Sequence, residues 1–155
     1  MKHQTCCFTG HRTIPENAHE EIQKRLETEI VNLIHQGVRH FCAGGARGFD
    51  TMAALTVLKL KPVFLFIRLI LVLPCKEQTK GWDKEDIETY RKILGQADEV
   101  IYVSGHYHPG CMQNRNRRLV DYSEFCICYL TESKGGTTYT VHYARRKGLQ
   151  VINLV

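Results

Sequence analysis

The sequence has no hydrophobic run long enough to cross a lipid bilayer. Its most apolar segment, PVFLFIRLILVLP from Pro62 to Pro74, is too short for a membrane span and carries Arg68 at its centre. We interpret this segment as a buried strand with part of a connection before it. We therefore expect no membrane partner.

The chain also lacks a C-x-x-C pair, and no signal peptide precedes the first expected strand. Its cysteines are odd in number and most lie in or beside apolar runs: Cys6, Cys7, Cys42, Cys75, Cys111, Cys126 and Cys128. This usage is typical of reduced thiols rather than of a disulfide framework. We expect a cytoplasmic protein.

A complete set of metal ligands is missing as well. The loop GHYHPGC places His106, His108 and Cys111 close together, and these could supply three zinc ligands. The loop is rich in turn residues and has no clear fourth ligand, so we favour an ordinary turn over a metal site.

We find no linker, internal repeat or low-complexity run, so we expect residues 1–155 to form a single domain. A chain of this length buries about two-thirds of its unfolded surface and needs no metal or disulfide to fold. Its 21 Lys+Arg against 16 Asp+Glu leave a net charge of +5. This modest excess suits an anionic ligand and does not by itself imply nucleic acid.

What the chain does contain is a regular alternation of strand-like and helix-like segments with short connections. This alternation predicts βαβ units, and hence an α/β fold: one Rossmann-like, doubly wound domain with helices on both faces of a mostly parallel sheet. The six expected strands are Gln4 to Thr9, Val38 to Ala43, Leu69 to Leu73, Glu99 to Val103, Phe125 to Leu130 and Gln150 to Leu154.

The expected helices carry recognisable start signals. Thr13 and Glu16 predict a capping box at the first helix, and Asp83 predicts the N-cap of the helix that ends near Leu94. For Asp50, at the start of the second helix, we favour helix capping over contact with a ribose.

Ligands of such sheets bind outside the carboxyl ends of the strands. Two glycine-rich corners lie there and lead into helices: Gly44 to Gly48 after the second strand, and Gly135-Gly136 after the fifth. Helix N-termini suit phosphate, and glycine lets the main chain come close to it. Each corner alone is explained equally well by a tight turn, but two corners in one sheet favour phosphate.

Neither corner matches G-x-G-x-x-G or the P-loop pattern, which disfavours a dinucleotide dehydrogenase and a P-loop NTPase. Arginines near the corners could add charge-assisted contacts, with Arg12, Arg47 and Arg115 as the leading candidates, and threonines could donate hydroxyls. The candidate ligand-binding residues are Gly10, His11, Arg12, Gly44, Gly45, Ala46, Arg47, Gly48, Asp50, Arg115, Asn116, Gly135, Gly136, Thr137 and Thr138.

Five sequence blocks carry a family resemblance. They are FTGHR at Phe8 to Arg12, GGARGFD at Gly44 to Asp50, LILVLPC at Leu69 to Cys75, PGCMQNRNRRLVD at Pro109 to Asp121 and KGGTTYTVHYA at Lys134 to Ala144. In this order they resemble the YpsA-type branch of the SLOG superfamily over nearly the whole chain. The resemblance implies a Rossmann-like fold, a homodimer and a nucleotide or ADP-ribose-like ligand. It implies no particular cofactor.

One related group, the lonely-guy phosphoribohydrolases, cleaves the base from a nucleoside monophosphate. Its helix motif M-H-x-R-K is partly matched by Met112 and Arg115, with Asn116 in place of the lysine. This resemblance implies an alternative function as an N-glycosidic hydrolase, with Arg115 and His142 as candidate catalytic residues.

The second motif of these hydrolases, P-G-G-x-G-T-x-x-E, is matched only at its paired glycines. Lys134 replaces the proline, Thr138 a glycine and His142 the catalytic glutamate. Cleavage needs a group that protonates the leaving base or positions water, and the family's carboxylate is missing. We therefore rank hydrolysis below ligand binding by a sensor or regulator.

A second related group, DNA-processing protein A, binds single-stranded DNA and has a G-x-A-R-G-x-D loop that closely matches Gly44 to Asp50. The present chain has only a mild positive charge and no obvious stacking platform of exposed aromatics. Binding of single-stranded DNA is therefore the third function that we consider.

Overall fold

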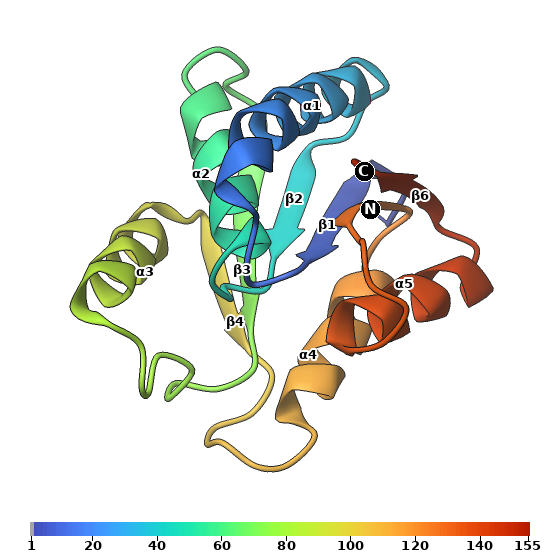
Figure 1. Cartoon of the computed structure of the whole chain (residues 1–155). Helices are drawn as coiled ribbons and strands as arrows, with labels where there is room; N and C mark the ends of the chain where they lie inside the picture. Colours follow the sequence, from blue (N-terminus) through green and yellow to red (C-terminus); the bar gives the residue numbers. More distant parts are fainter. Residues whose placement is uncertain (1) are drawn as a thin grey trace.

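A sheet of six parallel strands forms the centre of the computed structural model, which describes residues 2–155 (Figure 1). Its spatial order is β4-β3-β2-β1-β5-β6, and every neighbouring pair is parallel. The strands are β1 (Thr5–Gly10), β2 (His40–Ala43), β3 (Arg68–Leu73), β4 (Glu99–Tyr102), β5 (Phe125–Tyr129) and β6 (Gln150–Asn153). The predicted α/β architecture is confirmed.

Helices cover both faces of the sheet. As Figure 1 shows, α1, α2 and α3 lie on one face, whereas α4 and α5 lie on the other. A short 3-10 helix, η1 (Lys2–Gln4), precedes β1. The five α-helices are α1 (Glu16–His35), α2 (Phe49–Leu60), α3 (Lys84–Gln96), α4 (Cys111–Asp121) and α5 (Gly136–Arg146). None of these helices is both long and apolar enough to span a bilayer.

The apolar spacing of the sequence explains the packing of α1. Its buried side chains recur on one face of the helix and pack with β-strand residues in the larger of two cores: Ile22, Leu26, Ile30, Leu33 and Ile34. The second core lies under α4 and α5 and contains four of the cysteines. All seven cysteines are free and buried, and burial raises the pKa of the Cys42 thiol above its usual range.

The helix start signals have mixed outcomes. Asp83 caps α3 as predicted, since its Oδ1 accepts the Asp86 N–H at 2.9 Å. The capping box at Thr13 is wrong, because Pro15 occupies the N-cap position of α1 and no side chain caps that helix. The proline fixes the backbone one residue before Glu16 and moves the helix start beyond the reach of Thr13.

The strand order places β1 beside both halves of the chain, with β2 on one side and β5 on the other. The connection after β1 leads to α1 on one face, while the connection after β5 leads to α5 on the opposite face. Successive connections diverge at this point and leave a crevice at the carboxyl edge of the sheet. The candidate site lies in this crevice.

Candidate functional site

Two adjoining cavities occupy the carboxyl edge. The first, which we call the glycine chamber, has a volume of about 520 Å³ and is lined by Thr9, Gly10, His11, Arg12, Ala46, Asp50, Gly110, Met112, Gln113, Arg115, Asn116, Lys134, Gly135, Gly136 and Thr137. The second, the aromatic chamber, has a volume of about 430 Å³ and is lined by Arg12, Ala46, Arg47, Glu77, Gln78, Lys80, Trp82, Tyr107 and Met112. The shared residues Arg12, Ala46 and Met112 show that the chambers meet.

The glycine chamber receives the N-termini of two helices. Gly110 is the N-cap of α4 and Gly135 is the N-cap of α5, and both line the cavity. Neither helix has a side-chain hydrogen bond at its cap. The first N–H groups of a helix lack intrahelical partners and carry a partial positive charge. This chamber therefore favours an anion, and the cationic side chains of Arg12 and Lys134 increase that preference.

The glycines at the start of α5 border open space. A Cβ atom at Gly135 or Gly136 would meet no atom within 4 Å. Gly135 has a φ of 110°, which disfavours other residues, whereas Gly136 has an ordinary backbone conformation. The main chain is thus accessible at this corner.

The glycines after β2 are packed against the protein itself. A Cβ at Gly44 would lie 2.6 Å from Arg115 Nη1, and one at Gly45 would lie 2.5 Å from Leu73 Cδ2. A Cβ at Gly48 would lie 2.2 Å from the Arg12 carbonyl oxygen. These three glycines line neither chamber. The structure thus gives them a packing role at a tight turn.

Arg115 lies deep in the same region, with only 4% of its surface exposed. Its Nη1 donates to the Gly44 carbonyl, its Nε donates to Asn116 Oδ1 at 2.7 Å, and its Nη2 lies 3.9 Å from Met112 Sδ. Burial lowers its pKa, whereas Asp50 opposes that shift. Its nitrogens are thus engaged within the protein, and Arg115 supports the wall of the chamber.

Asp50 is the second residue of α2 and does not cap that helix, so our capping prediction is wrong. Its Oδ2 instead accepts the Ala46 N–H at 3.3 Å, and Arg115 provides the strongest opposing charge. Burial nevertheless raises the pKa of Asp50 from 3.8 to about 6. The glycine chamber therefore contains a buried carboxyl group that titrates near neutral pH.

The remaining candidates differ in their access to the chambers. Thr137 lines the glycine chamber, but Thr138 is buried and donates to the Glu132 carbonyl at 3.1 Å. His11 lines the chamber as well, and its Nε2 accepts the Thr131 N–H at 2.9 Å. His142 is exposed on α5 and lines neither chamber.

The residues of the GHYHPGC loop do not converge on a common point. His106 faces Glu77 at 3.4 Å, His108 lies 2.9 Å from the Pro109 carbonyl, and Cys111 is fully buried. Across residues 2–155, no group of three or more His, Cys, Asp and Glu is arranged to hold a metal ion. The structure thus brings no metal-ligand set together at this loop.

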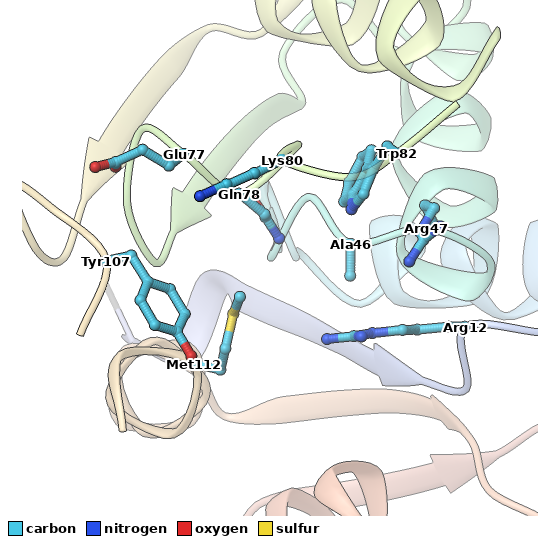
Figure 2. Close-up of a pocket in the computed structure, with 9 residues that line it drawn as sticks. All are labelled: Arg12, Ala46, Arg47, Glu77, Gln78, Lys80, Trp82, Tyr107 and Met112. Atoms are coloured by element: carbon cyan, nitrogen blue, oxygen red, sulfur yellow. The ribbon is translucent and has the colours of Figure 1, made fainter. Parts of the chain in front are cut away.

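The aromatic chamber contains functional candidates that our sequence reasoning missed. Arg47, which the sequence predicts as a phosphate partner, lines this chamber, and its Cζ lies 5.1 Å from the centre of the Trp82 ring (Figure 2). Trp82, Gln78 and Lys80 lie on the connection between β3 and α3, and Tyr107 lies on the connection before α4. The only available signal was the single tryptophan of the chain, placed in a polar turn.

The fold and the cleft define a Rossmann-like α/β protein with a ligand-sized site at the carboxyl edge of its sheet. Residues 7–151 match the family model called YpsA, whose description is 'YspA SLOG family'. The chain belongs to this family.

Two curated relatives illustrate the family. The chain is 34% identical over 139 residues to the uncharacterized SPbeta prophage-derived protein YoqJ of Bacillus subtilis, a match that covers 81% of each chain. It is 32% identical over 132 residues to a UPF0398 protein of Halalkalibacterium halodurans, covering 83% of this chain and 70% of the relative.

Two solved structures share the fold. DNA processing protein A of Streptococcus pneumoniae matches with a TM-score of 0.68 at 15% identity, covering 97% of this chain and 50% of the other. DNA processing protein A of Helicobacter pylori, which binds single-stranded DNA, matches with a TM-score of 0.67 at 16% identity, covering 95% and 63%. The present chain thus corresponds to a part of each of these longer proteins.

Proposed function

We propose that this protein binds a nucleotide or a nucleotide-derived, ADP-ribose-like ligand in the cleft and acts as a sensor or regulator. The observation that carries the proposal is the convergence of two helix N-termini, neither capped by a side chain, on the glycine chamber. Such an arrangement favours a phosphate group through backbone N–H groups and the helix dipoles.

The neighbouring aromatic chamber supports a ligand larger than phosphate. The two chambers have volumes of about 520 and 430 Å³, within the range of small-molecule sites. Exposed Arg12 lies at their junction, where it can contact a phosphate or a sugar. A phosphorylated nucleoside fits this succession of an anion-binding and an aromatic environment.

The proposal is tested by replacing Gly136 with aspartate. We expect nucleotides that raise the thermal midpoint of the wild type to lose that effect, with affinity reduced about 10- to 100-fold by charge repulsion. The fold should remain intact, because a carboxylate in the first turn of α5 interacts favourably with the helix dipole and a Cβ there meets open space. A thermal-shift assay with a nucleotide panel measures the midpoint, and isothermal titration calorimetry with the same panel measures the affinity.

Two variants serve as controls. Gly136→Ala adds the same Cβ without charge and should retain binding. Gly95→Asp introduces the same charge on α3, where a Cβ also meets open space, and should bind like the wild type. Unchanged nucleotide binding by Gly136→Asp, or no binding by the wild type to any member of the panel, would contradict the proposal.

N-glycosidic hydrolysis is the alternative activity. It is supported by the buried Asp50 carboxyl in the glycine chamber, whose pKa of about 6 suits general acid–base catalysis. Incubation with nucleoside monophosphates should then release free base in the wild type but not in Asp50→Asn. Nucleotide binding without base release would leave the sensor function and exclude the hydrolase.

Binding of single-stranded DNA is the other candidate. Half-buried Trp82 beside Arg47 provides the stacking surface that the sequence does not reveal, and the H. pylori protein of the same fold binds such DNA. Titration of a labelled oligonucleotide at several salt concentrations distinguishes this function by a steep salt dependence.

We also propose that the protein is a homodimer, from the family resemblance, and that it is cytoplasmic, from the cysteine usage. Light scattering measures the mass of the assembly.

A further inference from the structure

Trp82 is held in place at the wall of the aromatic chamber. Its ring meets the Tyr90 ring edge-on, with centroids 5.5 Å apart and an interplanar angle of 89°. The Arg47 guanidinium lies 5.1 Å from the Trp82 ring centre. Figure 2 shows Arg47 on one side of this ring, with Gln78 and Tyr107 on its other side. One face of the indole is therefore directed toward the cavity.

Aromatic surface also lines the opposite wall. Tyr107 is 61% exposed and lines the same chamber, with Met112 next to it (Figure 2). Flat aromatic groups bind between such side chains because stacking and sulfur contacts are favourable without a specific hydrogen-bond pattern. The chamber thus suits a planar, heteroaromatic ligand group.

Gln78 adds a polar feature to this chamber. It is only 6% exposed, and its Nε2 donates to the Gly44 carbonyl at 3.2 Å. Its Oε1 has no hydrogen-bond partner among residues 2–155. Turning the amide over would place oxygen against the Gly44 oxygen, so the acceptor role of Oε1 is determined by its surroundings. A buried acceptor without a donor is unfavourable. Because Oε1 lies beside Gly45 and is closed off from solvent, a ligand N–H group reaches it only when the Gln78 side chain turns toward the chamber that it lines.

We propose that the aromatic chamber is a nucleobase subsite that binds an amino-bearing purine, such as adenine, stacked on Trp82 with its amino group directed to Gln78. This inference rests on the proposed nucleotide function, because the adjoining glycine chamber would hold the phosphate of the same ligand. Arg12, Ala46 and Met112 lie where the two chambers meet and would border the sugar.

The test compares three probes: adenosine monophosphate, ribose 5-phosphate and purine riboside monophosphate, which lacks the amino group. In the wild type we expect adenosine monophosphate to bind most tightly. Trp82→Ala should weaken adenosine monophosphate about 10- to 100-fold and leave ribose 5-phosphate unchanged. Trp82→Phe retains an aromatic ring and should restore most of the loss, which separates stacking from a folding defect.

Gln78→Met tests recognition of the amino group. This variant keeps the length of the side chain and should bind adenosine monophosphate and purine riboside monophosphate equally, whereas the wild type should prefer the former about 5- to 10-fold. Equal effects of Trp82→Ala on all three probes, or a loss confined to oligonucleotides, would overturn the base subsite. If Gly136→Asp loses all three probes while Trp82→Ala binds them like the wild type, the base subsite is overturned and the phosphate site is still supported.

Discussion

Replacing Gly48 with alanine is expected to destabilise the protein by about 3 to 5 kcal/mol. Gly48 has a φ of 76° and a ψ of −121°, a conformation that residues with a side chain rarely adopt. The added Cβ would also lie 2.2 Å from the Arg12 carbonyl oxygen, and this backbone atom cannot move aside as a flexible side chain would. Chemical denaturation measures the change in the free energy of unfolding.

Gly148→Ala is the matched control. Gly148 also has a positive φ, 85°, but a Cβ there would meet no atom within 4 Å. Its replacement should cost only the backbone strain, about 1 to 2 kcal/mol. Equal losses of unfolding free energy in the two variants would show that the contact between the added Cβ and the Arg12 carbonyl has no destabilising effect.

Arg115→Ala is expected to cost roughly 3 to 5 kcal/mol, because it removes a buried cation and leaves the Asp50 carboxyl without its main opposing charge. The Gly44 carbonyl would also lose the hydrogen bond from Nη1. The loss should shrink below about pH 6, where Asp50 takes up a proton and becomes neutral. Urea denaturation over a range of pH gives this dependence.

Asp50→Asn isolates the titration itself. The folded-state pKa of about 6 lies above the unfolded value of 3.8, so the folded protein binds the proton more tightly. Wild-type stability from this group is therefore present at low pH and is lost as the pH rises through about 6. Relative to Asp50→Asn, the wild type should lose about 2 to 3 kcal/mol between about pH 4 and about pH 7. A constant difference would contradict the raised pKa.

The alternation of apolar strands and amphipathic helices predicted the fold, because that pattern depends on neighbours within one element. The roles of the glycines could not be predicted in the same way. The corner after β2 has the same appearance whether it holds phosphate or makes a tight turn. The two roles differ in what lies next to the position that a Cβ would take. At Gly44 this neighbour is the Arg115 side chain, which comes from α4.

The sequence predicted the lining of the cleft at Gly135 and Gly136, where glycines mark the start of α5. It missed the lining where a long connection contributes side chains. Gln78 and Trp82 follow β3 in a segment of successive turns, whose path depends on contacts with Gly44 and Tyr90. No local pattern specifies those contacts. The sequence therefore indicated the glycine chamber but not the aromatic chamber.

The lining of the cleft extends along the chain from Thr9 to Thr137, with contributions from every connection at the carboxyl edge. No fragment of the sheet can assemble this lining, so we expect a ligand of the cleft to bind only the fully folded chain. Occupancy should therefore slow hydrogen exchange of the globally protected amides in β1 and β5. At a ligand concentration of about 100 times Kd, global unfolding should become about 2.7 kcal/mol less favourable.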